Sequence, residues 1–497
     1  MRSSAGLAFV LMGISSFLGC GALGSSGGSG GRGTAGVSGA SGGTAGGTGG
    51  TTSQGGGGGG GGAGARPGTG GQETGGSGMA GAGTGTGGAQ SGGIAGTAGT
   101  AGTAGTAGTA GTAGSAGNTG GSAGSGTVAP PGLGSCTLPG GANFADAQAA
   151  YARFKTDLLT TVGAGGFLRV RRPNSGTPLD TTNSEGISYG MTIAVYMNDQ
   201  ATFDQLWKYE QLHLNARGLM DWEINPEGTA PTPLGKGAAT DGDEDMAFAL
   251  LMADKKWGGS GSLANTYLNF ARRQIDLIWQ FEVDHTRGDI LSPGDQFGGA
   301  AVINISYFAP AYYRAFGRAT GQIANWNRVV ESSYAVIART LNAANGNVTN
   351  GLVPAWSTPA GVPQVPPNTA HPIHHQLDSC RTPFRLAQDY CWNNEPLALA
   401  YLQKINAFHA SVGARNIVEG YNLNGTVFPG ANLNLAAFVG PAGVGAMATP
   451  AHGTLRAQAY SALVTPPGLL GGSLYYNHSW NVLSLIMMTG RFVDLTK

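Results

Sequence analysis

The chain has 497 residues and equal numbers of basic and acidic side chains, so its formal net charge is zero. It has no run rich in Lys or Arg and no basic stretch with interleaved aromatic residues, which excludes the usual pattern of a nucleic-acid-binding protein. The composition also divides the chain, because 91 residues are Gly whereas all eight Trp lie beyond residue 200. We therefore expect no nucleic-acid partner and a packed core only in the second part.

Residues 1–20 have the layout of a signal peptide. Arg2 precedes an apolar stretch, A-G-L-A-F-V-L-M-G-I, and F-L-G-C follows, ending at Cys20. The apolar stretch is too short for a transmembrane helix. Gly19 before Cys20 resembles a bacterial lipobox, in which this Cys is lipidated and becomes the mature N-terminus. We expect an exported protein held at the cell surface or outer membrane by a lipid anchor, with plain secretion as the alternative.

Residues 21–134 consist almost entirely of Gly, Ala, Ser and Thr, with a recurring T-A-G triplet. Such a composition offers too little apolar surface to offset the entropy of an ordered chain. The Gly residues follow no Pro-rich G-x-y period, which argues against a collagen-like helix. The segment is predicted to be a disordered, flexible linker between the anchor and a globular domain.

Residues 135–497 are predicted to form one large all-α domain. Apolar residues recur at helical spacing from Phe144 onward, and the pattern returns along the rest of the chain without β-α-β alternation. About a dozen helices exceed a simple bundle and indicate a closed, layered arrangement of helical hairpins. After the first, the expected helices cover 187–197, 202–213, 244–255, 263–281, 307–320, 323–342, 383–392, 395–412, 433–447, 451–463 and 474–489.

The stretch T-T-N-S-E-G-I-S-Y-G raises two incompatible catalytic hypotheses. Ser188 fits the G-x-S-x-G pattern of a serine esterase, but that nucleophile needs an apolar strand before it, and the preceding residues are polar. They favour a helix with Asn183 or Ser184 as its N-cap. Ser188 would then lie one turn inside the helix and bond to the backbone. Glu185, in the first turn, remains as a carboxylic acid catalyst.

Two further groups of carboxylates occur in settings that are typical of loops. One is G-A-A-T-D-G-D-E-D, which includes Asp241, and the other is Q-L-D-S-C-R-T-P, which includes Asp378. Hydrolysis of a glycosidic bond needs one protonated carboxyl group to donate to the leaving oxygen and one ionised group to activate water. A third carboxylate nearby would help to keep the acid protonated.

Two motifs contain residue types that can bind a metal ion. The run Asp241 to Asp245 imitates the start of an EF-hand loop, but Met246 replaces the required Gly and Met252 the bidentate Glu. The segment H-P-I-H-H could ligate zinc, yet no H-E-x-x-H frame accompanies it. We expect neither a metal nor a cofactor.

Three cysteines remain after Cys20, an odd number for an exported protein. One disulfide and one free thiol is the simplest account. Cys380 and Cys391 would be about 16 Å apart on one straight helix, too far to bond. Either that helix is broken or one of the two pairs with Cys136.

Six motifs together resemble those of bacterial glycoside hydrolase family 8, over residues 144–492. In chain order they are S-E-G-I-S-Y-G-M-T, G-L-M-D-W, A-T-D-G-D-E-D-M-A, N-I-S-Y-F-A-P-A-Y-Y, D-S-C-R-T-P-F-R and Y-Y-N-H-S…M-T-G-R-F. The resemblance implies an (α/α)6 barrel of six helical hairpins. It also implies an inverting enzyme that cuts internal β-1,4 bonds in cellulose, mixed-linkage glucan, xylan or chitosan.

By motif position, the resemblance implies that Glu185 is the general acid and Asp378 the general base. Asp241 would bind the distorted sugar at the cleavage point. For an inverting enzyme, the two catalytic carboxyl groups should lie about 6.5 to 9.5 Å apart. The other implied sugar contacts are Arg381, Trp222 and Tyr476, joined by Tyr189 and Tyr307, for which packing in the core is an equal alternative.

Two positions differ from the family pattern and bear on the substrate. Leu377 precedes Asp378 where endoglucanase-like members often have an aromatic residue, and Ile303 stands where they tend to have Trp. We predict a monomeric endoglucanase acting on cellulose or mixed-linkage β-glucan. The alternatives are the same mechanism on xylan or chitosan, and a carbohydrate-binding lipoprotein without catalysis.

Overall fold

The computed structural model describes residues 132–366, 373–466 and 468–497. The expected signal peptide, Cys20 and nearly all of the expected linker lie outside these residues. Within them, no helix combines the length and the apolar character that crossing a membrane requires. Leu133 is fully buried, so packed residues begin slightly ahead of residue 135.

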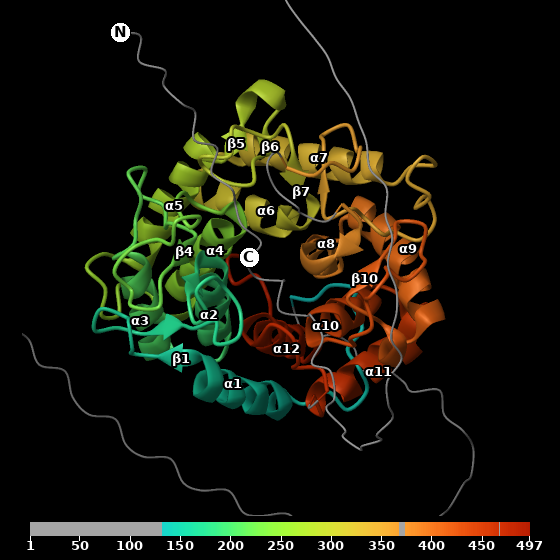
Figure 1. Ribbon diagram of the computed structural model, residues 1–497, viewed down its shortest axis with the longest axis horizontal. Helices are drawn as coiled ribbons and strands as arrows, with labels where there is room; N and C mark the ends of the chain where they lie inside the picture. Colours follow the sequence, from blue (N-terminus) through green and yellow to red (C-terminus); the bar gives the residue numbers. More distant parts are fainter. Residues whose placement is uncertain (1–131, 367–372, 467) are drawn as a thin grey trace, which may run out of the picture. The chain divides into compact units, whose positions relative to one another are not determined.

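Six helices form a closed inner ring (Figure 1). Each packs against the next in chain order, and the last packs against the first. Their residues are almost all buried, which explains the many Ala, Gly and aliphatic side chains on every face of these helices. The inner helices are α2 (Ser184–Tyr196), α4 (Thr240–Trp257), α6 (Pro310–Thr320), α8 (Thr382–Asn393), α10 (Ala436–Gly445) and α12 (Leu474–Met488).

Six outer helices surround this ring, each packed against an inner helix next to it in the chain or, for the first, against the last inner helix. They bury only one face, as in α5, where the buried positions Tyr267, Ala271, Ile275 and Ile278 follow the helical period. The outer helices are α1 (Phe144–Leu158), α3 (Gln200–Glu210), α5 (Tyr267–Phe281), α7 (Ile323–Thr340), α9 (Pro396–Val412) and α11 (Gly453–Val464).

The described residues thus form an (α/α)6 barrel of twelve α-helices, which confirms the all-α prediction. One expectation within it was wrong. The run Asp241 to Asp245 is not a loop, because α4 begins at Thr240 and includes it. Aspartates are stabilising at a helix N-terminus, where they face the positive end of the helix dipole, so a polar run here marks a helix start.

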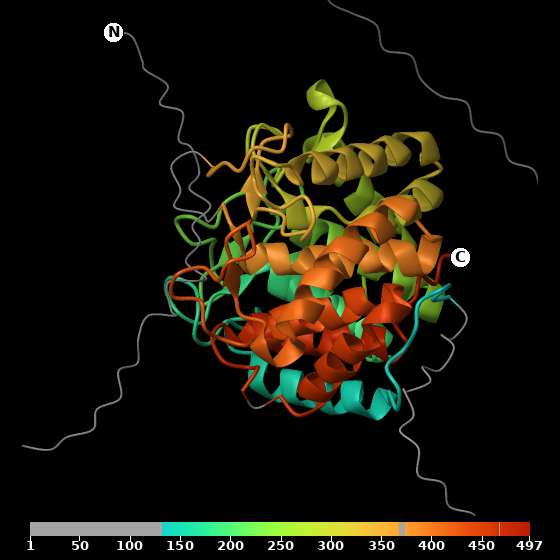
Figure 2. The ribbon, with the colours of Figure 1, turned by 90° about the vertical axis from the view of Figure 1, so that its right-hand side faces the viewer.

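The described strands are two residues long and pair antiparallel in five ladders, β1–β2, β3–β4, β5–β6, β7–β8 and β9–β10. Three of them lead directly toward inner helices: β3 into α2, β7 into the 3-10 helix η2, and β9 into η3. In Figure 2 the long connections gather at one end of the barrel, at the left, and the C-terminus lies at the other. The strands are β1 (Leu159–Thr160), β2 (Arg169–Val170), β3 (Thr182–Asn183), β4 (Glu223–Ile224), β5 (Val283–Asp284), β6 (Ile290–Leu291), β7 (Ile303–Asn304), β8 (Trp356–Ser357), β9 (His375–Gln376) and β10 (Gly420–Tyr421). The 3-10 helices are η1 (His285–Arg287), η2 (Ile305–Tyr307), η3 (Leu377–Arg381), η4 (Ala414–Asn416), η5 (Ala446–Ala448) and η6 (Pro450–His452).

A disulfide joins Cys136 to Cys391, and Cys380 is a buried free thiol. Of the pairings that the sequence left open, the structure therefore has the one between the start of the domain and α8. Cys380 lies in η3 and Cys391 near the end of α8, so most of that helix separates them.

Candidate active site

Three carboxylates meet where inner-ring segments begin. Glu185 lies in the first turn of α2, Asp241 in the first turn of α4, and Asp378 in η3, which runs directly into α8. The guanidinium of Arg381 lies between them. Its Nη1 is 2.5 Å from Glu185 Oε1 and 2.7 Å from Asp241 Oδ2, and its Nη2 is 3.5 Å from Asp378 Oδ1. The structure thus brings together four of the residues that the sequence singled out.

The spacing of the two carboxyl groups is limited by this shared contact. Because one planar guanidinium touches both, Glu185 Oε1 and Asp378 Oδ1 are less than about 9 Å apart. The Arg381 side chain is only 1% exposed, whereas that of Asp378 is 21% exposed. Asp378 is therefore the most accessible of the three carboxylates, and Arg381 balances their charge from below the surface.

Glycines explain how two helix starts approach so closely. A Cβ on Gly242 would lie 2.7 Å from Ser184 Oγ and 3.0 Å from the Ser184 carbonyl carbon. A Cβ on Gly186 would lie 2.9 Å from the Asn183 side chain. Gly242 thus allows α4 to begin against Ser184 of α2, whereas Gly186 makes room for the Asn183 cap of its own helix.

Each oxygen of Glu185 has its own partners. Oε1 accepts from the Tyr189 hydroxyl at 3.0 Å in addition to Arg381. Oε2 accepts from the Tyr475 hydroxyl at 2.6 Å and lies 3.5 Å from Asn183 Nδ2. The carboxyl group is therefore fixed in orientation from α2, η3 and α12.

Asp378 is positioned by its neighbours in chain and space. Asn304, which caps η2, donates from Nδ2 to Asp378 Oδ2 at 2.8 Å. Leu377 has a φ of 51°, in the left-handed region that a branched side chain rarely adopts. Such backbone strain is tolerated where the surroundings enforce it, and here it turns the chain so that Asp378 faces the other two carboxylates.

Burial dominates the electrostatics of the site. It raises the pKa of Asp241 to about 7; Arg381 opposes this, and the negative charges of Glu185 and Asp378 add to it. Burial also raises the pKa of Asp378 above its ordinary value, with Arg381 and the Asn304 hydrogen bond acting against the shift. Three carboxylates share one cation, so the site favours retention of a proton near neutral pH.

The four expected aromatic contacts have different surroundings. Tyr307 places its ring face 5.1 Å from the Arg381 guanidinium, and Trp222 donates from Nε1 to the Leu234 carbonyl at 2.8 Å. Tyr189 is almost fully buried and hydrogen-bonds to Glu185, which makes it a support of the carboxylate rather than an open platform. Tyr476 lines a cavity beside the site.

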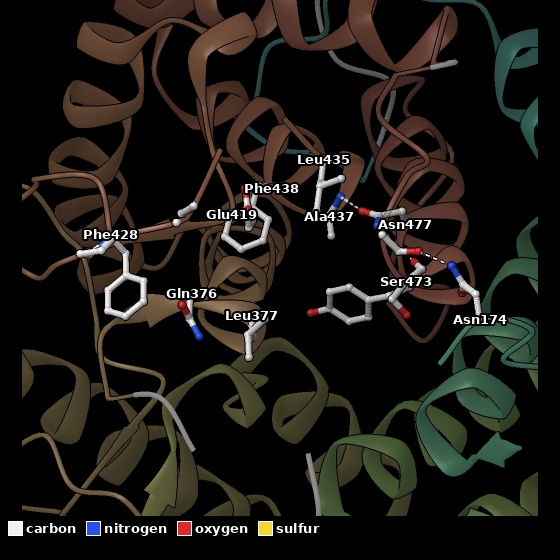
Figure 3. A pocket seen from close by; sticks show the side chains of 15 residues that line it. Asn174, Gln376, Leu377, Glu419, Phe428, Leu435, Ala437, Phe438, Ser473 and Asn477 are labelled. Carbon is white, nitrogen blue, oxygen red and sulfur yellow. Dashed lines mark hydrogen bonds between the residues drawn. The ribbon is translucent and has the colours of Figure 1, made fainter. Parts of the chain in front are cut away.

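That cavity has a volume of about 320 Å³ and adjoins Asp378 through Leu377. Figure 3 shows Gln376, Leu377 and Phe428 on one side and Ser473, Asn477 and Asn174 on the other. Phe438 and the carboxylate of Glu419 complete the lining. Amide, hydroxyl and aromatic groups of this kind bind the hydroxyls and apolar faces of sugar rings.

Other residues that the sequence singled out bond to groups other than the three carboxylates. Ser188 is buried and donates to the Glu185 carbonyl at 2.8 Å, as predicted for a helix interior. Asp245 forms two hydrogen bonds with Arg385, at 2.6 and 2.8 Å. His374 stacks on Phe428, whereas His371 lies outside the described residues. Among the described residues, no group of three or more candidate ligands is arranged to hold a metal ion.

Three contacts of the site were not predicted from the sequence: Tyr475, Asn183 as a side-chain donor, and Asn304. The last two each end a short strand and cap the helical segment that follows. The available signal was the Asn directly before S-E-G and the Asn directly before I-S-Y. Tyr475 gave none, because the Y-Y pair offers two hydroxyls and only the packing of α12 decides which one meets Glu185.

Comparison with known proteins places the chain among the glycoside hydrolases. Endoglucanase A of Acetivibrio thermocellus is 36% identical over 346 residues, 69% of each chain. A beta-glucanase of Niallia circulans is 30% identical over 363 residues, 69% of this chain and 84% of its own. The solved beta-1,3-1,4-glucanase of Paenibacillus sp. X4 has a TM-score of 0.64 at 28% identity, covering 74% of this chain and 97% of its own. Residues 136–490 match the model described as glycosyl hydrolases family 8, and the chain belongs to that family.

Proposed function

We propose that this protein cuts internal β-1,4 bonds of cellulose or mixed-linkage β-glucan, with inversion at the anomeric carbon. The observation that carries the proposal is the cluster of Glu185, Asp241 and Asp378 around Arg381 at one end of the barrel. The relatives named as endoglucanase and beta-glucanase support the choice of β-glucan.

In the proposed mechanism Glu185 is the general acid and Asp378 the general base. Glu185 donates its proton to the glycosidic oxygen as the bond from that oxygen to the anomeric carbon breaks. Asp378 takes a proton from a water molecule, whose oxygen bonds to the same carbon from the opposite face. The separation below about 9 Å between the two carboxyl groups stays under the upper limit of the range of about 6.5 to 9.5 Å for inverting enzymes, and the anomer of the product distinguishes inversion from the about 5 to 5.5 Å arrangement of retaining enzymes.

Asp241 is proposed to hold the sugar at the cleavage point, and Arg381 balances the three carboxylates. Once a bound substrate takes over one of these contacts, Arg381 becomes a donor to sugar hydroxyls. Tyr307 and Trp222 would contact the sugar chain, as would Tyr476 in the cavity beside Leu377.

We further propose that the enzyme is exported and anchored through lipidated Cys20. Its support is the sequence pattern at residues 1–20 and the Gly-, Ala- and Thr-rich segment 21–134, which would tether the barrel away from the membrane. Plain secretion remains the alternative. Labelling of cells with a radioactive fatty acid, with Cys20→Ala as the control, distinguishes the two.

The test of the activity is reducing-end release by the full chain on carboxymethylcellulose, mixed-linkage β-glucan, xylan and chitosan. We expect activity on the first two and at least a roughly 100-fold loss in Glu185→Gln, since proton donation contributes about that much or more. Proton NMR should show the α-anomer as the first product, because inversion converts a β-linkage. A β-anomer would contradict the assignment of Asp378 as base.

One observation favours xylan or chitosan as the second candidate. Leu377 is aliphatic and borders the 320 Å³ cavity, so no aromatic ring lies directly before Asp378. Ile303, by contrast, is fully buried and exposes no surface to a sugar. Activity confined to xylan or chitosan would keep the mechanism and overturn the substrate.

A further inference from the structure

Tyr475 lies in the first turn of α12 and is only 1% exposed. Its hydroxyl is 2.6 Å from Glu185 Oε2, although the two residues are 290 positions apart in the chain. Burial, together with the charge of Glu185, raises the pKa of Tyr475 well above its ordinary value. The hydroxyl therefore keeps its proton at every pH at which the enzyme works, and it remains a donor.

Asn183 fixes the direction of that donor. Asn183 Oδ1 accepts from the Gly186 backbone N–H at 2.9 Å as the N-cap of α2. The amide is thereby oriented with its NH₂ group toward the Tyr475 oxygen, at 3.0 Å. A hydroxyl that accepts from an NH₂ group directs its own hydrogen to another acceptor, and Glu185 Oε2 is the one within reach.

Oε1 of Glu185 accepts from both Arg381 and Tyr189, whereas Oε2 has one short contact, the Tyr475 hydroxyl, so Oε2 is the oxygen with room to exchange a proton with a substrate. The guanidinium of Arg172 packs against the Tyr475 ring at 5.2 Å from its centre, and Arg172 also forms an ion pair with Glu223. The titratable and charged groups that act on Glu185 are Tyr189 from α2, Asp241 from α4, Tyr307 from η2, Asp378, Cys380 and Arg381 from η3, and Tyr475 and Tyr476 from α12.

We propose that Tyr475, oriented by Asn183, is a positioning residue that aims Glu185 Oε2 at the leaving oxygen and stabilises the carboxylate formed after proton donation. The inference rests on the proposed role of Glu185 as general acid. A hydrogen bond to an ionised group is stronger than one to a neutral group, so the Tyr475 contact strengthens as the proton leaves. Tyr475 does not touch the substrate and acts only through Glu185.

The test compares Tyr475→Phe with Tyr334→Phe. Tyr334 is a matched control, because it is buried and donates to Asp389 Oδ2 at 2.6 Å in another part of the barrel. In Tyr475→Phe we expect kcat on mixed-linkage β-glucan to fall roughly 10- to 100-fold with KM nearly unchanged. The lost hydrogen bond stabilises ionised Glu185, so its removal favours the protonated acid. The alkaline limb of the pH profile of kcat/KM should therefore move up by about one pH unit. Tyr334→Phe should leave both limbs in place.

Two further measurements separate positioning from stability. An aryl β-cellotrioside with a good leaving group needs little protonation, so Tyr475→Phe should affect its hydrolysis much less than that of glucan. Asn183→Ser keeps an N-cap but removes the donor to Tyr475, and it should reproduce part of the kinetic change. If both variants lose only thermal stability and keep the wild-type pH profile, the inference is overturned. Full activity of Glu185→Gln would instead overturn the proposed function itself.

Discussion

The electrostatic setting of Asp241 opposes its proposed role in activity to the stability of the folded protein. Its side chain is 5% exposed, and it shares Arg381 with two other acids. The raised pKa of about 7 means that the folded protein binds a proton which the unfolded chain releases above its ordinary pKa of 3.8. Its contribution to stability is therefore complete below about pH 4 and is lost as the pH rises through 7.

This pH dependence of stability gives a prediction for the variant Asp241→Asn, whose side chain is neutral at every pH. Thermal unfolding at pH 8 should show the variant more stable than the wild type by roughly 2 to 4 kcal/mol, with a much smaller difference at pH 4. Hydrolysis of β-glucan should fall by at least about 100-fold in the same protein, because the proposed sugar contact loses its charge. An equal stability difference at the two pH values would show that the charge of Asp241 is not what strains the folded state.

At the scale of single residues, motif and chemistry were enough to bring Glu185, Asp378, Asp241 and Arg381 into one hypothesis. The hydroxyl of Tyr475 was beyond reach, since the choice between Tyr475 and Tyr476 depends on the rotation of α12 about its own axis. For Tyr189 the sequence left core packing and sugar contact as equal alternatives, and the structure buries it. Its place one turn after Glu185 is visible in the sequence, but whether that face points to solvent is not.

At the scale of elements, the site depends on how closely α2 and α4 begin beside each other. Gly242 allows this approach, because a Cβ there would lie within 3.0 Å of both side-chain and backbone atoms of Ser184. Backbone atoms cannot turn away as a flexible side chain does, so an added methyl group must move the start of α4.

We therefore expect Gly242→Ala to lower kcat/KM by at least about tenfold, since it displaces Asp241 from Arg381 and Glu185. Unfolding should become easier by about 1 to 3 kcal/mol. Gly453→Ala is the matched control, because Gly453 begins α11 and the nearest atom to a Cβ there is the end of the Arg456 side chain at 3.6 Å. Equal effects of the two changes on denaturation and activity would contradict the role of close approach.

Helical period predicted the existence of every inner and outer helix but not where α2 and α4 begin. For α2, capping chemistry supplied the start, because Asn183 was one of the two predicted N-caps and is the N-cap in the structure. For α4 it did not, and the helix expected at 244–255 starts at Thr240. The polar run Asp241 to Asp245 therefore hides this helix start from a hydrophobic pattern.

At the scale of the whole molecule, the disulfide lies away from the carboxylate cluster. The proposed catalytic groups lie at the starts of inner-ring segments, whereas Cys391 lies near the C-terminal end of α8 and is bonded to Cys136 across 255 residues. The sequence left this pairing open, because pairing between distant cysteines depends on how the ring closes and not on any local pattern.

Removal of this disulfide should therefore change stability and leave the chemistry intact. Closing so long a loop restricts the unfolded chain, and its loss should cost about 3 to 5 kcal/mol of unfolding free energy. We expect Cys136→Ser with Cys391→Ser to lower Tm by several degrees while kcat on β-glucan at a temperature well below Tm stays within about twofold.

Cys380→Ser serves as the comparison, because that thiol lies in η3 beside Asp378 and Arg381, 3.5 Å from the Tyr476 hydroxyl. The serine there should act on kinetics more than on Tm. A large kinetic loss in the double variant at low temperature would mean that the far end of α8 does influence the position of Asp378.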